Sequence, residues 1–170
     1  ELGYDAHTVE LCRIAAFMHD IGNVVNRNDH AQTGAVMAFR ILDNMGMEPS
    51  DVAAVITAIG HHDDSTAFPV NAIAAALLLA DKTDVRRSRV RNKEHQSFDI
   101  HDRVNYAAER SDLELDAQRR TITLSLTINT EFCAVMDYFE IFLERMLLCR
   151  RAAEFLELTF KLDINGLNLL

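Results

Sequence analysis

The stretch Phe17-Met18-His19-Asp20-Ile21-Gly22 places an imidazole beside a carboxylate at the end of an apolar segment. An unpaired carboxylate in apolar surroundings is strongly unfavourable or is forced to take up a proton, whereas a divalent cation satisfies both groups at once. The stretch therefore predicts a metal site, and its remaining ligands must come from elsewhere in the chain.

The composition is that of an ordinary globular protein, with 170 residues, of which 49% are hydrophobic and 25% charged. The longest apolar run, residues 72–80, is far shorter than a membrane span, and residues 1–4 do not resemble a signal peptide. The three cysteines form no close pair, which argues against a disulfide framework and a thiolate metal site. We therefore expect a reduced, cytoplasmic protein with no membrane partner.

The charge is unevenly distributed along the chain. The net charge is −9, yet residues 81–93 contain six bases and two acids, a local +4, so the remainder carries −13. One basic strip on an acidic protein suits a small anionic ligand better than a nucleic-acid duplex. A solvated helix end with bases near its C-terminus would have the same composition, so both interpretations of the strip stay open.

Two amphipathic helices are predicted before residue 47. Asp5 can cap the first, which ends near Gly22. Asn28 or Asp29 caps the second, which stops at Gly46. Their predicted inward faces are Leu11, Ile14, Ala15 and Met18 in the first helix, and Val36, Phe39 and Leu42 in the second.

Two more helices are predicted before residue 85. A third helix follows Pro49 and has the inward face Val52, Val55, Ile56 and Ile59. A fourth helix is apolar on every side over residues 72–80, which is typical of the buried central helix of a bundle. It ends in Asp81, which needs a partner because Lys82 faces about 100° away along the helix. An arginine of a neighbouring helix could be that partner.

The hydrophobic period changes in the last third of the chain. Residues 121–128 and 158–164 alternate as strands do. The helix predicted between them has the inward face Phe132, Val135, Met136, Phe139, Leu143, Met146 and Leu147. Residues 85–97 are expected to be exposed, and a short helix is expected over 101–109.

The predicted fold is therefore mainly α, with a helical bundle over residues 1–112 and a strand–helix–strand (α+β) appendage over residues 113–170. Two strands make a poor sheet on their own. We expect them to pair with each other and to gain support from the bundle or from a second copy of the chain, which leaves a homodimer open.

Histidines and acids gather where the predicted helices end. The six candidate ligands are His19, Asp20, His30, His61, His62 and Asp81. Such nitrogen and carboxylate ligands suit a divalent metal, as one or two ions of Mn, Fe, Co, Ni, Zn or Mg. Each histidine alone is more often structural than ligating, but the set together predicts a metal centre.

This ordered set resembles the HD-domain superfamily of metal-dependent phosphohydrolases. The residues that carry the resemblance are His19-Asp20-Ile21-Gly22, His30, Gly34-Ala35, His61-His62 and Ala80-Asp81. The segments 58–62 and 79–82 are also similar to the HD-type diadenosine tetraphosphate hydrolases. The resemblance covers roughly residues 15–91 and implies hydrolysis of a phosphate ester or anhydride of a nucleotide or small phosphorylated metabolite, through a metal-activated water.

The resemblance also implies roles for the candidate ligands. His19 and Asp20 would bind metal, and Asp20 would bridge two ions as the catalytic carboxylate. His30 and one or both of His61 and His62 would complete a second site.

Further roles follow at the end of the apolar helix. Asp81 would close the first metal site. Lys82, Arg86 and Arg89 are spaced four and three residues apart on one helical face, where they could hold the substrate phosphates.

Two departures from the family pattern bear on activity. The family's first histidine precedes the HD pair by a few tens of residues, so we expect that ligand and its helix upstream of Glu1. Asn23 stands where many members have lysine, which puts in doubt any role of that lysine with the leaving group. A regulatory HD domain that binds metal or nucleotide without turnover, and dimerises through its C-terminal unit, is the alternative function.

Overall fold

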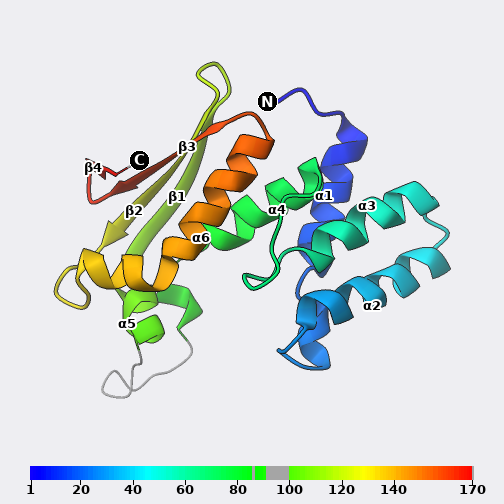
Figure 1. The fold of residues 1–170 in the computed structure, drawn as a ribbon, viewed down its shortest axis with the longest axis horizontal. Coiled ribbons are helices and arrows are strands. Elements are labelled where there is room, and N and C mark those ends of the chain that lie inside the picture. The colour runs from blue at the N-terminus through cyan, green and yellow to red at the C-terminus, as the bar shows by residue number, and fades with distance from the viewer. Residues whose placement is uncertain (86, 91–99, 170) are drawn as a thin grey trace. The chain divides into compact units, whose positions relative to one another are not determined.

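The computed structural model describes residues 1–85, 87–90 and 100–169, which form two compact units (Figure 1). The units comprise residues 1–80 and 81–170 and are described separately. The mainly helical fold with a C-terminal strand–helix–strand part, predicted from the sequence, is confirmed. The units divide within the last turn of a helix, whereas residue 112, the predicted boundary, lies inside a paired strand.

The first unit contains three complete helices, one short turn and most of a fourth helix. They are α1 (Ala6–Met18), the 3-10 turn η1 (Ile21–Val24), α2 (His30–Asn44), α3 (Pro49–Gly60) and α4 (Ala72–Lys82). As predicted, the Asp5 side chain caps α1 by accepting a hydrogen bond of 2.7 Å from the backbone N–H of Thr8. Pro49 opens α3, and Gly46 adopts a positive φ just after α2.

The buried faces of α1, α3 and α4 largely follow the hydrophobic pattern. Three of the four predicted residues are buried in α1 and three of four in α3, while Ile14 and Ile56 pack at the edge of the same core. In α4 the buried residues are Ile73, Ala74, Ala75, Leu77, Leu78 and Leu79. The prediction of a buried α4 therefore holds for most of its length, although Ala80 is exposed.

The predicted inward face of α2 is wrong at two positions. Val36 is 70% exposed and Phe39 is 46% exposed. The helix instead buries a face of mostly small residues, namely His30, Ala31, Gly34, Ala38 and Leu42. This helix packs against both α3 and η1, and small side chains allow the backbones to approach closely.

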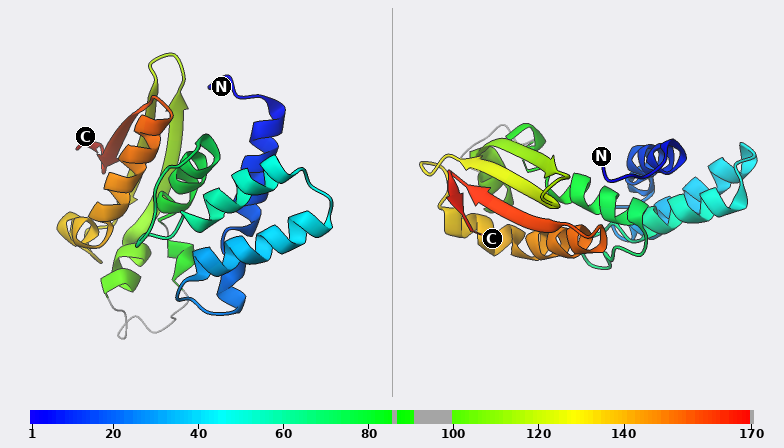
Figure 2. Two further views of the ribbon diagram at one scale, coloured as in Figure 1. Left: turned by 45° about the vertical axis from the view of Figure 1, so that its right-hand side comes forward. Right: turned by 90° about the horizontal axis from the view of Figure 1, so that it is seen from above.

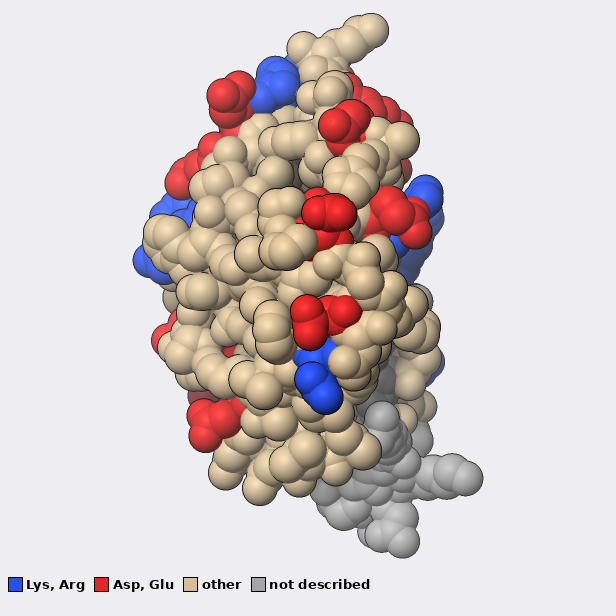
Figure 3. All heavy atoms as spheres, turned by 90° about the vertical axis from the view of Figure 1, so that its right-hand side faces the viewer, with Lys and Arg blue, Asp and Glu red and all other residues tan. Residues whose placement is uncertain are grey.

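Figure 3 views the side of the molecule at the right of Figure 1, where charged groups are scattered over a largely uncharged surface.

The second unit is a sheet with helices. Its elements are η2 (Arg87–Arg89), α5 (Ile100–Ala107), β1 (Ala108–Asp116), β2 (Thr121–Ile128), α6 (Val135–Phe155), β3 (Thr159–Ile164) and β4 (Leu167–Asn168). The strand order is β1-β2-β3-β4. The expected pairing of the two predicted strands is observed, with β2 parallel to β3 and Leu124 opposite Leu162. Helix α6 connects these two strands and lies along one face of the sheet (Figure 2).

Two strands were not anticipated from the sequence. Strand β1 pairs antiparallel with β2, from Ala108 opposite Ile128 to Asp116 opposite Thr121, and β4 pairs antiparallel with β3. The short helix expected over residues 101–109 therefore ends at Ala107. Strands β1 and β4 give the β2–β3 pair support from within the same chain.

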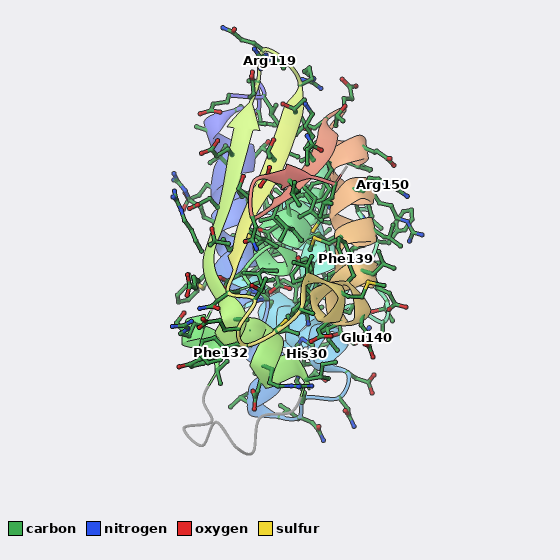
Figure 4. The ribbon with its side chains drawn as sticks, turned by 90° about the vertical axis from the view of Figure 1, so that its left-hand side faces the viewer. His30, Arg119, Phe132, Phe139, Glu140 and Arg150 are labelled. Carbon is green, nitrogen blue, oxygen red and sulfur yellow. The ribbon has the colours of Figure 1, made fainter. Side chains whose placement is uncertain are left out.

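The predicted inward face of α6 is wrong at most positions, since of its seven predicted residues Met146 alone is buried. The residues it buries include Tyr138, Phe142, Met146 and Cys149, which recur every three or four residues and face the sheet. Met136 is 76% exposed and Leu143 is also exposed. Both lie on a second apolar stripe of this helix, and the hydrophobic pattern alone does not show which stripe is buried. Figure 4 shows Glu140 and Arg150 on α6, and Arg119 at the tip of the β1–β2 hairpin.

Candidate metal centre

Four of the six candidate ligands meet in the first unit. His19 follows the last residue of α1, Asp20 precedes η1, His30 is the first residue of α2 and His62 lies just beyond α3. His30 and His62 are buried, whereas the side chain of Asp20 is half exposed. The meeting of these helix ends produces a polar cluster that is open on one side.

The ring nitrogens converge on one carboxylate. The Oδ2 atom of Asp20 lies 3.7 Å from Nε2 of His19. Its Oδ1 atom lies 3.3 Å from Nε2 of His30 and 3.7 Å from Nε2 of His62. Donor atoms of His19, Asp20 and His62 all lie within 4.8 Å of one another. The two carboxylate oxygens thus face different histidines.

The opposite ring nitrogen of each histidine is held by a backbone carbonyl. The Nδ1 atoms of His19, His30 and His62 lie 2.7, 3.0 and 2.6 Å from the carbonyl oxygens of residues 16, 27 and 59. A carbonyl oxygen only accepts, so each Nδ1 carries the hydrogen. In a neutral ring the Nε2 lone pair then points into the cluster, which is the usual second contact of a metal-binding histidine.

One contact in the cluster tests whether a cation fits there. The Nε2 atoms of His30 and His62 lie only 3.1 Å apart, with the two rings edge to face at 4.9 Å. When both rings are neutral, both nitrogens present lone pairs, which repel. A proton or a metal ion near them removes that repulsion. The donor set therefore fits a divalent cation, and His19, Asp20, His30 and His62 are the residues that would hold it.

Close packing of two glycines fixes the position of His30. A Cβ atom on Gly22 would overlap the carbonyl oxygen of His30 and would lie 2.7 Å from the backbone N of Gly34. A Cβ atom added to Gly34 would lie only 3.3 Å from the carbonyl oxygen of His19. The glycine of the opening sequence stretch thus lets η1 lie directly against the first turns of α2.

Arg27 is a further residue of the centre, and the sequence analysis missed it. Its Nη1 atom lies 3.2 Å from Nε2 of His30 and 3.7 Å from Oδ1 of Asp20. The same Nη1 donates to Oδ1 of Asn23 at 3.2 Å. Its position three residues before the candidate ligand His30 could have indicated a place near the centre, but no periodic pattern covers this loop.

Among the described residues, His61 shows no direct contact with the cluster. Its Nδ1 donates to the carbonyl oxygen of Thr57 at 2.9 Å, as in the other histidines. Within the described residues, however, His61 forms no ion pair or ring contact with Asp20 or His62. The geometry thus favours His62 of this adjacent pair as the ligand.

The remaining predicted residues belong to the second unit. Lys82 is buried and its Nζ donates to Oδ2 of Asp81 at 2.6 Å, so the expectation that Lys82 faces away from Asp81 is wrong. The flexible lysine stem lets the ammonium group fold back onto the preceding residue. Ligation by Asp81 stays a prediction. Arg86 and the side chain of Arg89 lie outside the described residues.

A comparison with known protein families identifies the family of this chain. The model of the HD domain matches residues 2–140, which is most of the sequence. The chain belongs to the HD-domain family. HD domains bind divalent metals and are generally metal-dependent hydrolases, which agrees with the His–Asp–His cluster. The match extends well beyond residue 91, where the resemblance noted in the sequence ends.

Neither a curated protein nor a solved structure matches the chain significantly. Among the described residues of this HD domain, no helix has the length and apolar character needed to cross a membrane.

Proposed function

We propose that this HD-domain protein is a metal-dependent phosphohydrolase that cleaves a phosphate ester or anhydride of a nucleotide or small phosphorylated metabolite. The observation that carries the proposal is the convergence of three Nε2 lone pairs on Asp20, each fixed by an Nδ1–H bond to a backbone carbonyl. A divalent cation bound there would lower the pKa of a bound water and stabilise charge on the transferring phosphoryl group.

The chain's own residues have distinct tasks in this mechanism. The carbonyl-bound histidines hold their lone pairs in one orientation, so little rearrangement is needed on binding. Asp20 offers one oxygen towards His19 and the other towards His30 and His62, an arrangement that supports the role of a carboxylate shared by two ions. Its half-exposed side chain leaves room for water and substrate on the open side of the centre.

We retain Asp81 as a proposed ligand that closes the first site, and we propose His62 ahead of His61 as the ligand that completes the second. Arg86 and Arg89 remain proposed phosphate-binding residues, and Lys82 is a weaker candidate because it is buried against Asp81. Arg86→Glu should raise the KM for phosphorylated substrates, since it would put a negative charge beside the phosphate. An unchanged KM would favour the other interpretation of the basic strip, a solvated helix end.

The experiment is an assay of phosphate release from a panel of nucleotides, diadenosine tetraphosphate included, in the presence of Mn²⁺, Co²⁺, Ni²⁺, Zn²⁺ or Mg²⁺. We expect turnover of at least one substrate with at least one metal, and its loss in Asp20→Asn, which keeps the shape of the side chain but removes its charge. Metal binding without turnover of any substrate would contradict the proposal.

The alternative is a regulatory HD domain that binds metal or nucleotide without turnover and dimerises through its C-terminal unit. The exposed Met136 and Leu143 on α6 favour such a contact, because apolar side chains are often covered in a partner interface. Sedimentation of the wild type and of Met136→Lys would test it. A monomeric wild-type protein would exclude dimerisation as the role of that face.

A further inference from the structure

Arg27 joins the metal centre through both its backbone and its side chain. Its carbonyl oxygen accepts the Nδ1–H bond of His30 at 3.0 Å. Its guanidinium reaches over the cluster to His30, Asp20 and Asn23, while the side chain stays 68% exposed. The backbone therefore orients a ligand, and the side chain places a positive charge at the open side of the centre.

The side-chain contact with His30 uses a lone pair that metal binding also needs. A guanidinium has only hydrogen-bond donors and cannot itself be a ligand. Nε2 of a neutral His30 has one lone pair, which it cannot give both to Arg27 and to a metal ion. A cation at the centre also repels the guanidinium. Arg27 must therefore give up its contact with His30 when a metal ion binds that nitrogen, and its exposure allows that movement.

Few other bases are available in this unit. Residues 1–80 contain only three, Arg13, Arg27 and Arg40, and no lysine. Arg13 pairs with Glu10 on α1 at 3.3 Å. Arg40 lies ten residues after His30, about 15 Å along α2. Among the described residues, Arg27 is the arginine that forms an ion pair with Asp20.

We infer that Arg27 binds the phosphoryl group of the substrate when the metal centre is loaded. A guanidinium displaced from His30 keeps the neutral Asn23 side chain as its hydrogen-bond partner, and its planar donors match two phosphate oxygens. The inference rests on the proposed function, since it assigns a residue to the recognition of that substrate's phosphate.

Calorimetry on the full chain tests the inference with two probes. Zn²⁺ is titrated into the metal-free protein, and inorganic phosphate is titrated into the metal-loaded protein. We expect Arg27→Ala to weaken phosphate binding by about 10- to 100-fold and to leave Zn²⁺ affinity unchanged or higher, because a competing cation is removed. Arg27→Lys should recover part of the phosphate affinity, and Arg40→Ala should match the wild type.

The possible outcomes separate this inference from the proposed function. Unchanged phosphate affinity in Arg27→Ala, or a loss confined to Zn²⁺ affinity, would overturn the inference and leave Arg27 as a support for His30. A wild-type protein that binds metal and phosphate but hydrolyses no nucleotide would contradict the phosphohydrolase alone. A wild type that binds no metal would overturn both.

Discussion

Gly22→Ala should damage both the fold and the metal centre, because the space for its side chain is filled by backbone. The added Cβ would overlap the carbonyl oxygen of His30 and would lie 2.9 Å from its carbonyl carbon and 2.7 Å from the N of Gly34. Ordinary Cβ contacts begin near 3.4 Å. These backbone atoms cannot rotate away, so α2 must shift away from η1.

The expected magnitude follows from these contacts. Overpacking costs about 1–3 kcal/mol, and a backbone obstacle places this site at the upper end, about 3 kcal/mol. The smaller entropy of the unfolded alanine chain offsets about 0.4–1 kcal/mol. We therefore expect the free energy of unfolding to fall by about 2 kcal/mol. Zn²⁺ affinity should fall about tenfold or more, since the displaced carbonyl belongs to His30.

Urea unfolding followed by circular dichroism and Zn²⁺ calorimetry would measure the two effects. Gly60→Ala is the matched control, because its Cβ would meet only the Cβ of Ala35 at 3.6 Å, an ordinary contact. It lies in α3, where alanine is favoured over glycine by up to about 1 kcal/mol. If Gly22→Ala unfolds within about 0.5 kcal/mol of the wild type and binds Zn²⁺ equally well, the close approach of η1 and α2 is refuted.

Three further predictions concern the metal ligands, the buried core of the second unit and a surface histidine. Asp20→Ala and His30→Ala should each lower metal content, measured by mass spectrometry, without loss of helical circular dichroism; full stoichiometry in both would exclude a two-metal site. Phe142→Ala should lower the free energy of unfolding by about 3–5 kcal/mol in urea titrations, because the ring is buried, while leaving metal affinity unchanged. The hydrogen bond to Asp51 raises the pKa of His7, so the stabilisation is present below the unfolded pKa of 6.5 and is lost as pH rises through the folded value. An NMR titration should show the His7 pKa falling in Asp51→Asn; equal values would contradict this.

The sequence predicted the starts of α1 and α3 well because they depend on local signals, whereas α1 ends at Met18, before the predicted Gly22. The Asp5 side chain and Pro49 mark starts of helices through hydrogen bonding and a fixed φ, and both effects act within one turn. Those ends placed His19, His30 and His62 correctly at the termini where the cluster forms.

Packing partners were less predictable than helix ends. Hydrophobicity favoured Val36 and Phe39 as the inner face of α2, but the close approach of α3 and η1 requires Gly34 and Ala38 there. Strand β1 escaped detection because its charged residues alternate only weakly with apolar ones, and its pairing with β2 depends on residues far along the chain.

The side-chain contacts within the metal centre also could not be predicted from the sequence. Spacing alone could not choose between His61 and His62, since both follow α3 and both donate Nδ1–H to a carbonyl. The contact between Arg27 and Asp20 could not be predicted, because it depends on how the loop before α2 folds. Side-chain direction depends on tertiary structure, and it is what favours His62 over His61 and brings Arg27 to Asp20.

Long-range ¹H–¹⁵N NMR of the imidazole rings during a Zn²⁺ titration tests the central claim most directly. The Nε2 signals of His19, His30 and His62 should shift to metal-bound values while their Nδ1 atoms keep their hydrogens, since those hydrogens bond to backbone carbonyls. The Nε2 signal of His61 should change little. Coordination through Nδ1, or no shift at these three rings, would contradict the proposed metal centre.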